Sequence, residues 1–149
     1  MNHKPLAELT LRRYEKPYRL QGRELVKRLC LSLGLLQTND GRDVMVDVFH
    51  SIVKAKEPIT QQEIERFVKD TRTANNLGER GSAPSNIRRQ VKRLRDLFLI
   101  ERTGSKYHLA EHGALHEVFT ERIEKVYLPA ILTRVKEYCE AVEKERHKE

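Results

Sequence analysis

Residues 82–113 read SAPSNIRRQVKRLRDLFLIERTGSKYHLAEHG, and this stretch decides the predicted fold. Four apolar residues in its first half recur at spacings of four, three and four, which places them on one face of a helix: Ile87, Val91, Leu94 and Phe98. The opposite face is cationic, because residues 83–95 include five Lys and Arg residues and no acidic residue. A buried apolar stripe with a cationic outer face is typical of helices that contact nucleic-acid phosphates.

A short hairpin is predicted directly after this helix. Residues 99–102 and 106–109 are strand candidates, and the turn between them contains Gly104, which can adopt the positive φ that a tight turn requires. The order of a basic helix and then a hairpin indicates a recognition helix followed by a wing.

In this region the chain resembles the winged helix-turn-helix family of DNA-binding regulators, in a pattern like that of the MarR and PadR types. The resemblance rests on Leu99-Ile100-Glu101-Arg102 and on the second strand with its continuation, Tyr107-His108-Leu109-Ala110-Glu111-His112-Gly113, and it covers residues 40–113 approximately. It implies a mainly α fold with a small β-hairpin wing. The family often has a glycine helix terminator where this chain has Phe98.

Two helices are predicted upstream of the basic helix. Residues 43–55 are mostly apolar and form the first. Thr60 and Glu63 have the spacing of a capping box, which predicts that a second helix begins at Gln61 and runs to about residue 70. Residues 71–81 are then expected to form a polar loop of eleven residues, longer than the few residues by which the family joins these helices.

The chain divides into three predicted parts. Residues 1–22 form a basic flexible arm, which either touches phosphate or packs loosely against the domain. Residues 23–113 form the winged-helix domain with an extra N-terminal helix over residues 23–36. Residues 114–149 form a C-terminal helical dimerisation segment, in which Pro129 is expected to cause a kink or a fresh helix start near Leu128.

An apolar seam follows this break at alternating spacings of three and four, the a/d pattern of paired helices. Its residues are Leu128, Ile131, Val135, Tyr138 and Val142. We expect this seam to form the interface of a homodimer, with the helix of residues 23–36 as a further contributor. An intramolecular helix packing would use the same pattern equally well.

Composition limits the classes of function. The net charge of +7 over 149 residues favours an anionic partner. No long apolar run predicts a membrane span and no secretory signal is visible, so a cytoplasmic protein is expected. Cys30 and Cys139 stand far apart, and the histidines have no cysteine nearby, so we expect no metal and no cofactor. The sequence has no P-loop, no nucleophile elbow and no pair of carboxylates with the spacing of an acid–base pair, so we expect no enzymatic activity.

The predicted function is that of a sequence-specific transcriptional regulator that binds double-stranded DNA as a homodimer. Ser85, Asn86 and Arg89 are expected to face base edges, and the remaining site residues are expected to bind phosphate: Arg88, Lys92, Arg93, Arg102 and Lys106. The alternatives are an architectural DNA-binding or RNA-binding module and a protein-interaction adaptor. No pattern indicates a particular small-molecule effector.

Overall fold

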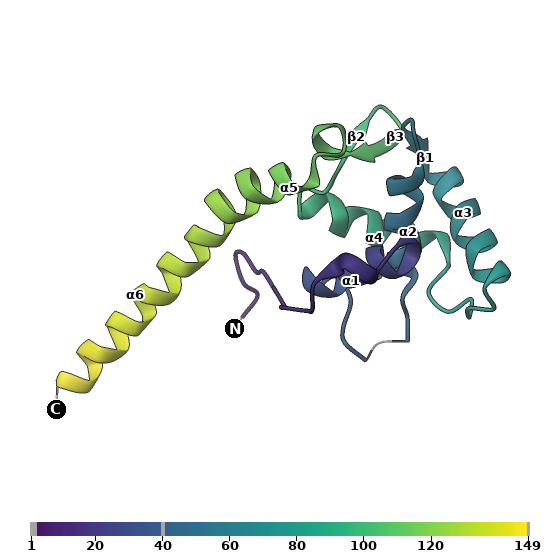
Figure 1. Cartoon of the computed structure of the whole chain (residues 1–149). Helices are drawn as coiled ribbons and strands as arrows, with labels where there is room; N and C mark the ends of the chain where they lie inside the picture. The colour runs from purple at the N-terminus through teal and green to yellow at the C-terminus, as the bar shows by residue number, and fades with distance from the viewer. Residues whose placement is uncertain (1–2, 40, 149) are drawn as a thin grey trace.

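The computed structural model describes residues 3–39 and 41–148, so the outermost residues of the predicted arm and of the predicted dimerisation segment lie outside it. A helical body carries a small sheet at one end, and a long helical rod projects from it (Figure 1). The predicted fold class, mainly α with a β-hairpin, is confirmed. The elements are η1 (Pro17–Arg19), α1 (Gly22–Ser32), α2 (Val44–Lys54), β1 (Ile59–Thr60), α3 (Gln61–Ala74), α4 (Pro84–Asp96), β2 (Ile100–Thr103), β3 (Lys106–Leu109), η2 (Ala110–Gly113), α5 (Leu115–Val118), η3 (Phe119–Tyr127) and α6 (Leu128–His147).

The core is built around α2, which packs against α1, α3 and α4. Val46, Val48 and Phe49 of α2 have no exposed surface, which explains why this helix is apolar on almost every side. The apolar stripe of α4 meets this core through Ile87, Val91 and Leu94, all buried as predicted. The outer face of α4 is thereby turned away from the core.

The hairpin of β2 and β3 is confirmed, and Gly104 in its turn has a φ of 63°. A third strand, β1, was not predicted. It pairs antiparallel with β3, with Ile59 opposite Tyr107, so that the sheet order is β1-β3-β2. This pairing fixes the hairpin to the start of α3, because β1 leads directly into the Thr60 cap. The predicted capping box is present, with the Glu63 N–H donating to Thr60 Oγ1 over 3.2 Å.

Three helices end with a residue in the left-handed region: Gly34 after α1, Asn76 after α3 and Phe98 after α4. At the end of α4 the Phe98 N–H donates to Arg95 O (2.9 Å) and the Leu99 N–H donates to Leu94 O (3.1 Å), the bond pair of a Schellman motif. The placement of Phe98 in the apolar stripe of the helix was therefore wrong. Its φ of 66° puts it beyond the helix end, at the position where the family resemblance led us to expect glycine.

Two predicted helix boundaries also change. The first helix ends at Ser32 and not at residue 36, because the positive φ of Gly34 (69°) reverses the chain there. The helix α3 continues to Ala74, four residues into the predicted polar loop. The extension is stabilised by Arg72, which is 4% exposed and donates from Nε to Gly78 O over 2.6 Å.

A buried cluster of charges, Arg23, Asp43, Asp47 and Arg72, joins the first three helices. Asp47 has no exposed surface and accepts hydrogen bonds from Arg23 (2.8 Å) and Arg72 (2.7 Å). Asp43 accepts from the same two arginines over 3.0 Å each. Burial raises the pKa of the Asp43 carboxyl, but the hydrogen bonds from Arg23 and Arg72 outweigh it, so that the pKa lies below its usual range. Sequence patterning missed this cluster because α2 was classified only as apolar.

The amino-terminal arm lies against the end of α1. The Arg12 N–H donates to Ser32 O (2.9 Å), and the Arg12 guanidinium donates to Leu31 O (2.7 Å) and Leu36 O (3.0 Å). Arg12 thereby bonds to carbonyl groups in the last turn of α1 and in the segment that follows it. Arg12, one of the cations of the predicted arm, is therefore used within the molecule.

The C-terminal rod is one continuous helical segment from Leu115 to His147 (Figure 1). A kink or a fresh helix start was predicted near Leu128, and α6 does begin there, but the preceding Tyr127 is itself helical (φ −69°, ψ −49°), so the helix is not interrupted. Residues 119–127 are wound as a π-helix, in which the Leu128 N–H donates to Ile123 O. Pro129 sits in the first turn of α6, where a missing N–H is tolerated. The kink expected from Pro129 is replaced by this change of winding.

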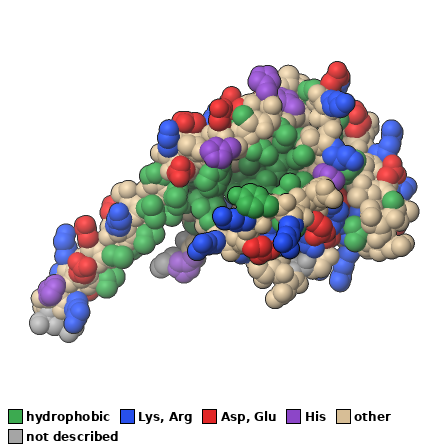
Figure 2. Space-filling view, in the orientation of Figure 1, with side chains coloured by type: hydrophobic (Ala, Val, Ile, Leu, Met, Phe, Trp, Pro, Cys, Tyr) green, Lys and Arg blue, Asp and Glu red, His purple; other side chains and the backbone are tan. Residues whose placement is uncertain are grey.

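One side of the rod is apolar, with Leu128 and Ile131 half-buried near the body and the part beyond them uncovered. Figure 2 shows hydrophobic side chains along it, continuing into a hollowed apolar region where the rod joins the body. Among the predicted seam residues, Val135, Tyr138 and Val142 are 55%, 69% and 68% exposed. Within the described ranges, no helix combines the length and the apolar character needed to span a membrane.

Candidate nucleic-acid interface

The exposed face of α4 carries the centre of the predicted interface. Ser85, Arg88, Arg89 and Lys92 are all exposed, because the buried stripe on the other side of the helix fixes its rotation. The first turn of α4 contains no acidic residue, so the positive end of the helix dipole adds to the side-chain charge. This face is suited to phosphate oxygens and to base edges.

Asn86 has a different surrounding from the other predicted base-facing residues. It is half-buried, and its Nδ2 donates to Gly81 O over 2.6 Å. Its Oδ1 accepts from Gln90 Nε2 (3.1 Å), and Gln90 Oε1 in turn accepts from Arg93 Nη1 (2.8 Å). This chain of hydrogen bonds orients the start of α4 and holds Arg93 along the helix. Ser85 and Arg89 are the exposed members of the base-facing set.

A cleft of about 540 Å³ runs along one side of α4, between this helix and the segment that joins α1 to α2. Three arginines line it: Arg42, Arg89 and Arg93. Ser85 and Gln37 add hydrogen-bonding groups, and no carboxylate is among the lining residues. Such a cleft attracts an anion. Arg42 was not predicted as a site residue, because it lies before α2 and far from α4 in the sequence.

The other side of the interface is formed by the last turns of α4 and by the hairpin. Lys92 Nζ lies 3.0 Å from Asp96 Oδ2, but both side chains are exposed, so the pair contributes little energy and can be exchanged for a contact with phosphate. Arg102 of β2 donates from Nε to Gly104 O over 2.7 Å, which leaves the end of its guanidinium in solvent. Lys106 is exposed at the start of β3.

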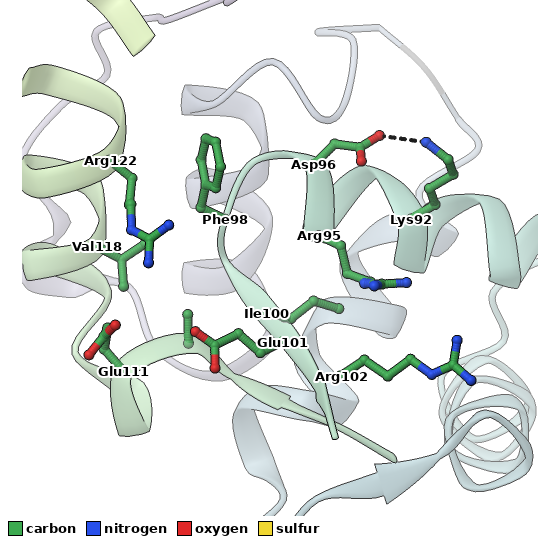
Figure 3. Close-up of a pocket in the computed structure, with 11 residues that line it drawn as sticks. Lys92, Arg95, Asp96, Phe98, Ile100, Glu101, Arg102, Glu111, Val118 and Arg122 are labelled. Carbon is green, nitrogen blue, oxygen red and sulfur yellow. Dashed lines mark hydrogen bonds and ion pairs between the residues drawn. The ribbon is translucent and has the colours of Figure 1, made fainter. Parts of the chain in front are cut away.

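A second groove, here called the junction groove, lies where α4, the hairpin and the C-terminal rod meet (Figure 3). Its volume is about 580 Å³. Lys92 and Arg102 border it on the side of the predicted interface, and Val118 and Arg122 border it on the side of the rod. Six of the predicted site residues therefore line two different cavities: Ser85, Asn86, Arg89 and Arg93 line the cleft, and Lys92 and Arg102 line the junction groove. Arg88 and Lys106 are exposed and line neither.

Comparison with known proteins assigns no family to the chain. No family model matches it, and no solved structure matches it. Among curated proteins, GDP-L-fucose synthase of Escherichia coli (strain K12) is 43% identical over 54 residues. The match covers 36% of this chain and 17% of the synthase. The chain thus spans less than a fifth of that enzyme's length, and the likeness carries no activity over to it.

Proposed function

We propose that the protein is a sequence-specific DNA-binding transcriptional regulator that acts as a homodimer in the cytoplasm. The observation that carries this proposal is the exposed cationic face of α4 beside a β-hairpin that bears Arg102 and Lys106. The order of α2, β1, α3, α4 and the hairpin is also the order of a winged helix-turn-helix domain, which supports the family resemblance of residues 40–113. A helix of this kind enters a major groove.

Within this proposal the residues have distinct roles. Arg89 lies near the N-terminal part of α4 and is exposed, and an arginine there is suited to bidentate hydrogen bonds with guanine. Arg88, Lys92 and Arg93 bind phosphate along the helix. Arg102 and Lys106 reach the backbone from the hairpin.

The homodimer is proposed from the uncovered side of α6. In the described part of the chain, the main packing partner of α6 is η3, the segment that directly precedes it, although the apolar residues of α6 repeat at a/d spacing. An apolar groove of about 410 Å³, lined in part by Leu25, Phe49 and Leu115, lies beside the start of the rod and adds a second apolar surface that includes α1. A two-fold pair of such chains would carry two copies of α4 for two half-sites.

Arg89→Ala and Lys92→Ala test the DNA proposal. Arg89→Ala should weaken binding to a cognate duplex by about 1 to 3 kcal/mol and relax specificity, whereas Lys92→Ala should weaken cognate and random duplexes alike. Lys144→Ala at the far end of α6 is the matched control, since it removes one exposed cation outside the interface. Competition binding on selected and random duplexes measures both effects. Unchanged affinity in the Arg89→Ala/Lys92→Ala double variant would refute the interface.

Val135→Asp tests the dimer. The substitution places a carboxylate in the proposed apolar seam, where burial without a partner is unfavourable, so the dimer should dissociate and DNA affinity should fall with it. Thr133→Asp adds the same charge on α6 outside the seam, so this variant should sediment with the mass of a dimer, as the parent does. Sedimentation gives the mass, and circular dichroism checks folding. A folded Val135→Asp protein with the parent's mass would place the interface elsewhere.

An architectural DNA-binding or RNA-binding role is the second candidate, favoured by the exposed cations of the arm. Arg13, Lys16 and Arg19 are exposed and can contact phosphates, and such contacts do not depend on the nucleotide sequence. Comparing duplex DNA, single-stranded DNA and structured RNA at two salt concentrations separates the candidates. Equal affinity for all duplex sequences, or a preference for RNA, would favour this second role.

A further inference from the structure

The junction groove has an apolar floor. Ile100, Ala110 and Val118 line it, and each is no more than 3% exposed, so its base is a packed surface of β2, η2 and α5. The ring of Phe98 forms a further part of the wall. A groove of about 580 Å³ lies in the size range of small-molecule sites, which are apolar with a few polar groups that fix orientation.

The rim of the groove carries charges of both signs that do not neutralise one another. Three arginines line the groove, and Arg102 is already engaged at Nε with Gly104 O (2.7 Å). Arg95 and Arg122 supply the other two guanidinium groups, and Glu101 and Glu111 supply two carboxylates. Figure 3 shows Arg122 and Glu111 on the side of the rod, Glu101 on the strand in the middle and Arg95 across from them. Among the described residues none of these four takes part in an ion pair, whereas the neighbouring Lys92 is paired with Asp96. Arg122 is held beside the groove by the Phe98 ring, 5.9 Å from its centroid.

The backbone around the groove is also unusual. Phe98 and Glu111 both line it, and both have positive φ values, 66° and 49°. Non-glycine residues in this conformation carry a conformational cost, and such residues tend to cluster at functional sites. Here the conformation of Phe98 directs its ring toward the rod, and that of Glu111 places its side chain at the groove.

We propose that the junction groove binds a small zwitterion with an apolar side chain, that is, a free α-amino acid. The ligand carboxylate pairs with Arg122 and its ammonium group pairs with Glu111 on the same side of the groove, while Arg95 and Glu101 complete the rim and the ligand side chain lies over Ile100, Ala110 and Val118. A monoanion or a monocation satisfies only half of this rim, so the two charges of the ligand are both required. The site consists of this chain's own residues, and binding there does not depend on the proposed DNA activity.

Isothermal titration calorimetry on the full chain without DNA tests the proposal with matched probes. L-leucine, L-methionine and L-phenylalanine are the amino acids, L-leucinamide lacks the carboxylate, and 4-methylpentanoate lacks the ammonium group. At least one of the three amino acids should bind. L-leucinamide and 4-methylpentanoate should each bind at least about tenfold more weakly than leucine, because each loses one charge-assisted contact. The proposal is overturned if no amino acid binds in the millimolar range, or if leucine and its two analogues bind equally well.

Two variants locate the site. Arg122→Gln and Glu111→Gln should each weaken amino-acid binding by about tenfold or more. Arg88→Gln, an exposed cation of α4 that does not line the groove, is the matched control and should bind as the parent does. Methyl NMR spectra supply a readout independent of affinity, since the ligand should shift Ile100 and Val118 and leave Val135 unmoved. Binding that persists in both groove variants with no shift at Ile100 would refute the assignment of the groove.

Discussion

The ring of Phe98 meets the ring of Tyr127 edge-on, with centroids 6.1 Å apart and planes at 90°. Phe98 lies two residues beyond the end of α4, and Tyr127 is the last residue before α6, so this contact joins the end of the predicted recognition helix to the C-terminal rod. The Tyr127 hydroxyl also accepts from the Glu8 N–H and donates to Glu8 O, each over 3.2 Å. Three segments far apart in the sequence therefore meet at Tyr127.

The conformation of Phe98 predicts an order of stability for its variants. Phe98→Ala and Phe98→Gly both lose the ring contact, but only alanine retains the cost of a left-handed backbone, so the glycine variant should be the more stable by about 1 kcal/mol. At the adjacent Leu97, where φ is −94°, the order should reverse. Urea unfolding of the four variants measures this. Equal stabilities at residue 98 would contradict the assigned backbone conformation.

The buried charge cluster should be sensitive to the loss of one charge. Asp47→Asn leaves Arg23 and Arg72 facing a neutral side chain at a position with no exposed surface, so the free energy of unfolding should fall by about 3 to 5 kcal/mol. Asp96→Asn is the matched control, because it breaks an exposed pair with Lys92 and should cost less than about 1 kcal/mol. Denaturant unfolding compares the two. Similar losses in both variants would show that the cluster is not the stabilising unit described here.

His50 should make stability depend on pH. Burial lowers the pKa of the His50 imidazole, Lys54 and Arg23 lower it further, and Asp47 opposes them. Its Nδ1 is buried without a hydrogen-bond partner among the described residues, and its ring packs edge-on against Phe67. The unfolded chain then binds a proton more readily than the folded protein, so this contribution is present above about pH 6.5 and is lost as the pH falls below it.

Thermal unfolding between about pH 7.5 and pH 5.5 tests this expectation. The parent should lose stability as the pH falls through this range, and His50→Gln should lose less. His116→Gln, which removes an exposed histidine, should retain the slope of the parent. An identical slope in His50→Gln would assign the pH dependence to other groups.

Gly34 should control the attachment of the arm. A Cβ at this position would lie 2.4 Å from Thr10 Cβ, and φ is 69°, so Gly34→Ala should displace the arm and break the Arg12 contacts with α1. Gly22→Ala has a comparable φ of 57° and no atom within 4 Å, so it should retain the arm. Brief trypsin digestion followed by mass spectrometry should show faster cleavage after Arg12 and Arg13 in Gly34→Ala only. Equal cleavage rates would mean that the Thr10 contact does not hold the arm.

The elements that the sequence predicted well are those determined by local chemistry. Thr60 and Glu63 specify the start of α3 within four residues, and Gly104 specifies the hairpin turn, so neither requires knowledge of distant segments. The face of α4 followed from periodicity alone, since Ile87, Val91 and Leu94 share one stripe.

The features that were missed depend on contacts between distant segments. Arg72 appears as an ordinary polar residue of a loop until Asp43 and Asp47 are brought to it from α2. Arg42 reaches the cleft beside α4 only because the segment before α2 folds next to that helix, and periodicity holds no information about that approach.

The winding of residues 119–127 has a consequence for the direction in which the seam points. In a π-helix each N–H bonds to the fifth preceding carbonyl, so the chain turns by a smaller angle per residue than in an α-helix. The side chains of α6 are therefore rotated about the rod axis relative to those of an uninterrupted α-helix. Leu128, Val135 and Val142 therefore face a different direction around the rod axis than they would if the rod were an α-helix throughout from Leu115. Any two-fold partner bound along that seam would meet the body at an orientation set by these nine residues.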